Sequence, residues 1–316
     1  MKKDKLIIGT RGSALALQQA RFVESLLHKT APGLDIELRI IKTTGDKILD
    51  TALSKIGDKG LFTREIEHHL LDGRIDIAVH SLKDLPTAAP PGLTIAAMTC
   101  REDPADVLIA KNQCTLDQLP PGAVVLTGSL RRRAQLLHRR PDLHVREVRG
   151  NVPTRLRKLD ESEAHALLAA AAGLNRLRLQ TCITQRLDPD DFLPACGQGA
   201  LAIQIRSDDP RTAAWIAPLD DPDTRRTVTA ERTVLAELEG GCQVPLGAYA
   251  RLRDGALHLR AMIADLSGDP LLTAAASAPP DRPESLGRTV AARLLDSGGR
   301  AILEKIKSES GGNLSS

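Results

Sequence analysis

The sequence has few aromatic residues and no features of a membrane or secreted protein. Phe, Trp and Tyr make up 2% of its 316 residues, so its cores must be built from Leu, Ile, Val and Ala. No apolar run approaches the roughly 20 residues that span a bilayer. The lysines at the N-terminus lead into a short apolar run and a polar turn, unlike a secretory signal. We therefore expect a cytoplasmic protein with no membrane partner.

Cysteine is also scarce. The 5 cysteines are widely spaced and form no CxxC pair, so we expect neither a disulfide framework nor a metal site. We interpret Cys100, Cys114, Cys182 and Cys196 as small apolar side chains of the core. The formal net charge of +3 is too small to predict nucleic-acid binding by itself.

The length and the 42% of apolar residues predict two or three globular domains. Residues 6–27 and 123–140 share one pattern, in which an apolar strand runs through Thr, Gly, Ser and Arg into an amphipathic helix. Because the first N–H groups of a helix are unpaired and its dipole attracts negative charge, each pattern offers an anion site. These sites fall at residues 10–13 and 127–132.

Strands and helices go on alternating after both patterns, which predicts two α/β domains of similar build with a ligand cleft between them. Beyond residue 220 the pattern changes. A helix with a glycine stop is followed by strands joined by turns at residues 253–255 and 267–270, and then by more helix. This predicts a smaller α+β domain with an antiparallel sheet.

Lys83 and Asp84 follow a buried strand directly and precede a proline, which is where α/β proteins often hold functional groups. The alternative is that Asp84 only caps the local backbone of a turn. A second candidate segment is the long polar stretch 42–60, which is typical of a lid. Lys55 and Lys59 would suit closure over an anion, although composition fits a flexible connection as well.

Several arginines occupy turn positions. Arg131, Arg132 and Arg133 open a helix, where cations oppose the helix dipole, so we expect an anion to offset them. Arg11, Arg149, Arg155 and Arg176 follow other strands, and guanidinium groups bind carboxylate or phosphate through paired hydrogen bonds. The pattern indicates a ligand with several anionic groups. For Arg133, Arg139 and Arg140 we favour the alternative of a solvated basic face.

Cys242 follows Gly240 and Gly241. Two glycines leave the backbone bare and would let a bulky group approach the sulfur, as a covalently attached ligand requires. The alternative is another small core side chain.

A series of ordered blocks between about residues 7 and 250 closely resembles the porphobilinogen deaminase, or hydroxymethylbilane synthase, family. The blocks are GTRGSALALQQA, KGLFTREIE, DIAVHSLKDLPT, REDPADVL, TGSLRRRAQL, REVRGNVPTRLRKL, AAAGLNRL, LPACGQGALAI and AERTVLAELEGGCQVPLGAYA.

The resemblance implies an α/β fold of two periplasmic-binding-protein-like (type II) domains plus a C-terminal α+β domain with a small antiparallel sheet. We expect domain 1 at 1–98 and 199–217, domain 2 at 105–194 and domain 3, which bears the cofactor, at 219–306. Residues 307–316 are expected to form a disordered tail.

The resemblance also implies a transferase that joins four porphobilinogen molecules into hydroxymethylbilane and releases ammonia, for porphyrin and haem biosynthesis. Its dipyrromethane cofactor would be bound to Cys242 through a thioether, and Asp84 would be catalytic. The cofactor would be held by Lys83, Thr127, Ser129, Arg131, Arg132 and Arg155. Substrate would be bound by Arg11, Ser13, Arg149, Arg155, Arg176 and Gln198.

Three positions depart from the family pattern, namely Gly128, Pro153 and His165, and they leave the detail of carboxylate binding open. Two rival functions fit parts of the sequence. A binding protein for small anions fits a twin-domain cleft equally well but needs no covalent pyrrole. Nucleic-acid binding through residues 129–140 lacks the aromatic platforms of single-strand binders. We expect a monomer that binds porphobilinogen and the growing polypyrrole chain, with no nucleic-acid partner.

Overall fold

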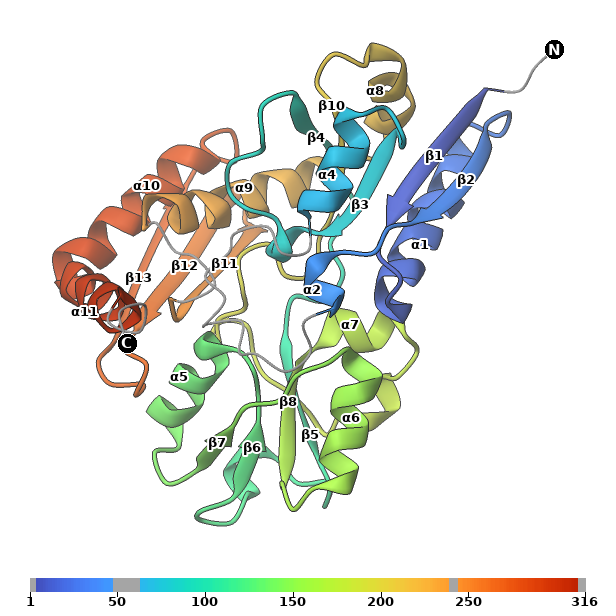
Figure 1. Cartoon of the computed structure of the whole chain (residues 1–316). Helices are drawn as coiled ribbons and strands as arrows, with labels where there is room; N and C mark the ends of the chain where they lie inside the picture. Colours follow the sequence, from blue (N-terminus) through green and yellow to red (C-terminus); the bar gives the residue numbers. More distant parts are fainter. Residues whose placement is uncertain (1–3, 48–62, 239–243, 312–316) are drawn as a thin grey trace. The chain divides into compact units, whose positions relative to one another are not determined.

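The structure is a computed structural model that describes residues 4–47, 63–238 and 244–311 (Figure 1). These residues form two compact units. The first unit contains residues up to 47, 63–102 and 199–225, and the second contains 103–198 and 226–311. The chain therefore leaves the first unit near residue 102, returns near residue 199 and leaves again after residue 225. The three-domain division stays a prediction.

The first unit is built on a five-stranded sheet in the order β2-β1-β3-β10-β4. Strand β1 pairs in parallel with β2 and β3, whereas β10 runs antiparallel to β3 and β4. Its strands are β1 (Lys5–Thr10), β2 (Asp35–Ile40), β3 (Ile77–Ser81), β4 (Leu93–Met98) and β10 (Leu201–Arg206). Its helices are α1 (Ala14–Thr30), α2 (Thr44–Lys47), α4 (Arg64–Leu71) and α8 (Pro210–Ile216), with 3-10 turns η1 (Leu82–Asp84) and η4 (Ala217–Leu219).

The second unit repeats this arrangement in a five-stranded sheet of order β7-β6-β8-β5-β9. Strand β6 pairs in parallel with β7 and β8, and β5 runs antiparallel to β8 and β9. The strands are β5 (Asp106–Ala110), β6 (Val124–Leu126), β7 (His144–Arg146), β8 (Ala166–Ala170) and β9 (Gln185–Arg186). The helices are α5 (Leu130–Arg139), α6 (Val152–Glu161) and α7 (Ala171–Arg176), with 3-10 turns η2 (Leu116–Gln118) and η3 (Gln180–Cys182). The predicted likeness of the two α/β parts is therefore correct.

Alternation along the strands explains how helices come to cover both faces of this sheet. Leu108 of β5 packs in one apolar cluster with Leu136 of α5, and its neighbour Val107 packs in another with Leu159 of α6. Successive strand side chains point to opposite faces, so a sheet covered on both sides reads as a continuous apolar run. Figure 1 shows α5 and α6 on opposite sides of the sheet.

The remaining part of the second unit is a three-stranded antiparallel sheet packed against helices, as the sequence predicted. Its elements are α9 (Pro222–Glu237), which belongs to this unit from residue 226 on, β11 (Leu246–Arg253), β12 (Ala256–Ala264), β13 (Leu271–Ala278), α10 (Pro283–Leu294), η5 (Leu295–Gly299) and α11 (Arg300–Gly311). Asp254 and Gly255 both have positive φ, which fits the tight β11–β12 hairpin. Helix α11 extends beyond residue 306, where the third domain was expected to end.

The cysteine interpretation was only partly right. Cys196 is buried, Cys114 and Cys182 are half-buried, and Cys100 is exposed two residues after the end of β4. The sequence around a single cysteine does not indicate whether its side chain is buried, so composition could not distinguish the buried cysteines from the exposed one. In the part of the chain that is described, no helix is both long and apolar enough to cross a membrane.

Candidate active site

Asp84 occupies a rigid position at the end of a buried strand. The first four residues of β3 are buried, and η1 follows directly. Leu82 and Leu85 are buried on either side of Asp84, and the Leu82 N–H donates to the carbonyl of Ala200 at 3.0 Å. Asp84 itself is exposed. The chain thus fixes the backbone of this residue while its carboxylate stays accessible.

The structure brings the other predicted residues of the first unit to the same edge of its sheet. Strands β1 and β3 are parallel neighbours, so the loop with Arg11 and Ser13 and the loop with Lys83 and Asp84 both lie at their carboxyl ends. The Ser13 hydroxyl accepts a hydrogen bond from the Ala16 N–H at 3.3 Å and caps α1. Gln19 of α1 donates to the Ser81 hydroxyl at 2.8 Å, which joins the helix after the first loop to the strand end before the second.

His80 lies beneath this edge and was missed by the sequence analysis. It is 6% exposed, and its Nε2 has no hydrogen-bond partner among the described residues. Burial lowers the pKa of His80 to about 4, so the ring is neutral near neutral pH. Its place inside an apolar strand gave no sign of this environment.

In the second unit the candidate residues follow three adjacent parallel strands, again at their carboxyl ends. Thr127 and Ser129 come after β6, Arg149 after β7, and Arg176 ends the helix after β8. The buried Thr127 hydroxyl accepts from the Ser129 N–H at 3.2 Å. The Ser129 hydroxyl in turn accepts from the Arg132 N–H at 3.4 Å and caps α5. The loop is therefore held in the shape that a helix N-terminus presents to an anion.

Arg149 and Arg155 are held by the turn between β7 and α6. The Arg149 Nε lies 3.3 Å from Glu147, and the Arg155 Nε donates to the carbonyl of Gly150 at 2.7 Å. The Arg149 Nη2 is buried without a hydrogen-bond partner among the described residues. Because a buried cationic donor without an acceptor is costly, this atom is suited to an anionic ligand.

Arg131 and Arg132 are buried, and both bind the same carboxylate. The Arg131 Nη1 lies 2.6 Å from Asp106 Oδ2, and the Arg132 Nη2 lies 2.8 Å from Asp106 Oδ1. Gln198 donates to Asp106 Oδ1 at 2.9 Å and to the carbonyl of Pro104 at 2.7 Å. Burial opposes ionisation of Asp106, but the two guanidinium groups hold its pKa well below the usual range.

Asp106 supplies part of the negative charge that was expected at the start of α5, and binding of the cofactor by these arginines stays a prediction. The first anion that offsets the two arginines belongs to the chain itself. The sequence carried a signal for it, because Asp106 begins a strand whose residues are all buried, and a charge there needs a partner. Among the other arginines, Arg133 and Arg139 are exposed as expected. Arg140 is half-buried and donates to the carbonyls of Leu116 and Leu119, so it is structural.

The three departures from the family pattern have local explanations. A Cβ on Gly128 would lie 2.8 Å from the carbonyl oxygen of Val148, so the backbone as it stands has no room for a side chain. Pro153 lies in the first turn of α6, where its missing N–H would have no partner within the helix. The His165 Nδ1 accepts from the Val124 N–H at 3.1 Å and joins β8 to β6.

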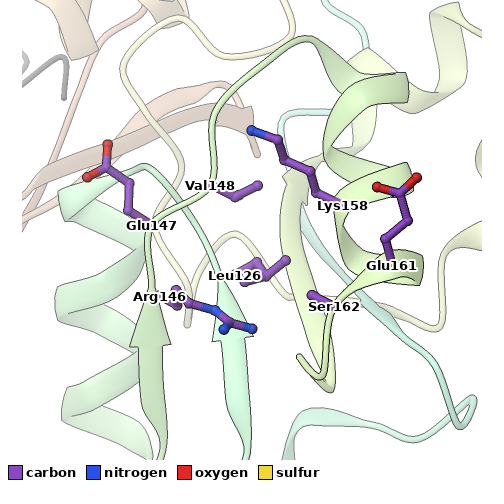
Figure 2. A pocket seen from close by; sticks show the side chains of 7 residues that line it. All are labelled: Leu126, Arg146, Glu147, Val148, Lys158, Glu161 and Ser162. Atoms are coloured by element: carbon purple, nitrogen blue, oxygen red, sulfur yellow. The ribbon is translucent and has the colours of Figure 1, made fainter. Parts of the chain in front are cut away.

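A pocket of about 280 Å³ in the second unit contains none of the predicted residues. Figure 2 shows Lys158 and Glu161 extending from α6 and Arg146 at the end of β7. The pocket is lined by Leu126, Arg146, Glu147, Val148, Lys158, Glu161 and Ser162. Its mixture of both charge signs does not match a ligand with several anionic groups.

Three predicted residues, Cys242, Lys55 and Lys59, lie outside the described residues. Within the described ranges, no group of three or more His, Cys, Asp or Glu side chains could hold a metal ion.

The two repeated sheets, with arginines and capped helix starts at their carboxyl edges, are features typical of α/β proteins that bind anionic ligands. Comparison with known families gives a narrower result. Residues 6–214 match the family model described as porphobilinogen deaminase, dipyromethane cofactor binding domain, and residues 225–296 match the C-terminal domain of the same enzyme. The chain belongs to the porphobilinogen deaminase family.

Curated relatives agree over nearly the full length. The chain is 50% identical to the porphobilinogen deaminase of Syntrophobacter fumaroxidans and 52% identical to that of Desulforudis audaxviator. Each match covers 96% of this chain and 98% of the relative. Members of the family are hydroxymethylbilane synthases, which are transferases of tetrapyrrole biosynthesis that act on porphobilinogen. The predicted family, enzyme class and dipyrromethane cofactor are therefore confirmed.

Solved structures give weaker likenesses. A TRAP periplasmic solute binding protein from Desulfovibrio salexigens matches at 12% identity and a TM-score of 0.41, over 69% of this chain and 73% of its own. The aliphatic sulphonate binding protein SsuA from Escherichia coli matches at 15% identity and a TM-score of 0.39, over 75% and 71%. The strand orders of the two similar five-stranded sheets and of the small antiparallel sheet confirm the predicted α/β fold class.

Proposed function

We propose that Asp84 is the catalytic carboxylate of this hydroxymethylbilane synthase. Loss of ammonia from porphobilinogen leaves positive charge that is delocalised onto the pyrrole nitrogen. A fixed carboxylate beside that nitrogen stabilises charge that develops only during the reaction, and such electrostatic effects are usually the largest in catalysis. The observation that carries the proposal is the accessible Asp84 side chain on a backbone anchored by Leu82 and Leu85.

The arginines and capped turns at the carboxyl edges would bind the acetate and propionate groups of substrate and cofactor. The unpartnered Arg149 Nη2 and the positive excess of Arg131 and Arg132 over Asp106 fit a group with several carboxylates, as dipyrromethane is. Lys83 and the hydroxyls of Ser13, Thr127 and Ser129 would add hydrogen bonds. Arg11, Arg155, Arg176 and Gln198 complete the proposed set.

Cys242 would hold the cofactor through a thioether, because a thiolate is a good nucleophile toward the electrophile that porphobilinogen forms. When bound, the dipyrromethane supplies the pyrrole end to which each new ring is added. In this proposal Lys55 and Lys59 belong to a lid over the anionic ligand. We further propose a monomer of the cytoplasm, with the three-domain division given above and no nucleic-acid or membrane partner.

Replacement of Asp84 by Ala tests the catalytic assignment. Transition-state stabilisation should fall by about 3 kcal/mol or more, the order measured when one stabilising hydrogen-bond donor is removed from an active site. Turnover of porphobilinogen should be measured beside Asp72→Ala, which removes another exposed carboxylate of the first unit. Near-normal turnover in Asp84→Ala would remove this residue from the mechanism.

The intact mass of the purified protein tests the attachment. It should exceed the sequence mass by two pyrrole units, and Cys242→Ser should lose that excess. An active wild-type protein without added mass would overturn the thioether. A protein that binds anions but carries no pyrrole and turns over no porphobilinogen would instead support the rival binding function.

A further inference from the structure

We propose that Asp106 is a positioning residue for pyrrole binding, which holds the Arg131 and Arg132 guanidinium groups in the orientation that receives a carboxylate of the cofactor. The inference rests on the proposed function of the arginines. It adds a residue that touches neither substrate nor cofactor and acts only through its two partners.

The geometry shows how the carboxylate orients both side chains. Oδ2 binds the Arg131 Nη1 at 2.6 Å, and Oδ1 binds the Arg132 Nε at 3.0 Å and Nη2 at 2.8 Å. The side chain of Asp106 is 0% exposed and those of the two arginines are each 6% exposed. Contacts of this kind hold a guanidinium plane in one orientation, so little freedom is lost when a ligand binds.

Other contacts leave part of each guanidinium available. The Arg131 Nη1 also donates to the carbonyl of Leu193 at 2.5 Å, and the Arg132 Nη1 donates to that of Leu168 at 3.3 Å. Among the described residues, the Nε and Nη2 groups of Arg131 have no hydrogen-bond partner. These are donors that an incoming carboxylate can use.

Charge balance supports the same role. One buried carboxylate between two buried arginines leaves a single net positive charge, and an uncompensated buried charge is costly. One further carboxylate would neutralise the cluster. Without Asp106 the two guanidinium groups would repel each other and would need two external anions.

The position of Asp106 in the sheet explains why its carboxylate lies beside Arg131 and Arg132. Strand β5 runs antiparallel to β8, so the first residue of β5 lies at the edge where β8 ends and where α5 begins after β6. Gln198 donates to Oδ1 from the segment that precedes β10. The carboxylate is therefore held from two separate parts of the chain, α5 and the segment before β10, which fixes its orientation toward the arginines.

The test compares Asp106→Asn, Asp106→Glu and Asp265→Asn in the full-length protein. Asp265 is a buried carboxylate of the same unit that binds the exposed Lys305 at 2.6 Å, so its variant loses the ion pair of a buried carboxylate without touching the arginines. Thermal unfolding, the mass excess of two pyrrole units, and KM and kcat for porphobilinogen are measured for each. Asp106→Asn should lower the fraction with the mass excess and raise KM by about 10-fold or more, since hydrogen bonds to charged groups are worth that order.

Asp265→Asn should keep pyrrole loading and KM within about twofold of the wild type. Asp106→Glu, which keeps the charge, should recover part of the loading. In Asp106→Ala, added formate should restore loading in proportion to its concentration, which a purely structural role would not produce.

Asp106→Asn with wild-type loading and KM, or an equal loss in Asp265→Asn, would overturn the inference. If Asp106→Asn does not fold, Asp106→Glu decides, and wild-type loading and KM in that variant would refute the need for this geometry. A wild-type protein that carries no pyrrole would contradict the proposed function itself. The intact mass of the wild type therefore distinguishes failure of the proposed function from failure of the inference about Asp106.

Discussion

At the level of single residues, buried charges of the second unit are matched by groups from distant parts of the chain. Asp106 binds two arginines, and Glu231, which is 0% exposed, accepts from the N–H groups of Gly197 and Ala250 at 2.7 and 2.8 Å. Charged groups in an apolar interior are stable only with such partners. The identity of each partner is therefore as informative as the charge itself.

Gly128 gives a prediction at this scale. Because a Cβ there would meet the Val148 carbonyl oxygen at 2.8 Å, Gly128→Ala should destabilise the protein by roughly 1 to 3 kcal/mol, the usual cost of overpacking. A Cβ added at Gly33 would have no atom within 4 Å apart from those of its chain neighbours, so Gly33→Ala serves as the control. Denaturant unfolding should show Gly33→Ala within about 0.5 kcal/mol of the wild type. Equal stability of the two variants would contradict the prediction.

At the level of elements, side chains at helix starts shape the candidate site. Ser13, Ser129 and Asn151 each accept a backbone hydrogen bond at the N-terminus of α1, α5 or α6. Such caps satisfy one helix donor and fix the loop before it. The same short residues therefore both begin the helices and orient the turns that carry Arg11 and Arg149, and Ser129 also fixes the first turn of α5, which carries Arg132.

A salt bridge between the β12–β13 connection and α11 gives a prediction at this scale. Lys305 and the hydroxyl and N–H of Ser267 lower the pKa of Asp265 to about 2, against about 3.9 in unfolded chains. A carboxyl whose pKa falls on folding stabilises the protein above its unfolded pKa, and this contribution is lost as pH falls from about 4 to about 2. Asp265→Asn should therefore be less stable than the wild type by roughly 1 to 2 kcal/mol at pH 7, allowing for solvent screening of Lys305.

Unfolding of both proteins between pH 7 and pH 3 measures this difference. The difference in the free energy of unfolding between the wild type and Asp265→Asn should become smaller as the pH falls below about 4. A difference in unfolding free energy that stays constant down to pH 3 would show that the ionised Asp265 carboxylate does not stabilise the fold through Lys305.

At the level of the whole molecule, the charge of the Arg131, Arg132 and Asp106 cluster predicts that the bound cofactor stabilises the fold. Cys242→Ser should remove the covalent cofactor and leave one net positive charge buried without its anion. We expect a lower melting temperature than for the wild type, with partial recovery when sulfate is added, because a ligand that binds only the folded state stabilises it.

Cys100→Ser, at an exposed cysteine, should change neither mass excess nor melting temperature. An unchanged melting temperature in Cys242→Ser would show that the cofactor does not satisfy this charge.

The sequence by itself determined the alternation of strands and helices, the changed pattern after residue 220 and the family. These follow from local periodicity, turn residues and ordered motifs, which each lie within one segment of chain. It also placed Asp84 at a strand end, since the buried run before it and the proline after it are neighbours in sequence.

The charged partner of Arg131 and Arg132 was decided only by the tertiary structure. Asp106 is 25 residues from Arg131, and antiparallel pairing of β5 with β8 is what brings the two together. Burial of His80 and Cys196, partial burial of Arg140 and exposure of Cys100 likewise depend on which elements pack over each residue, and no local sequence pattern indicates them.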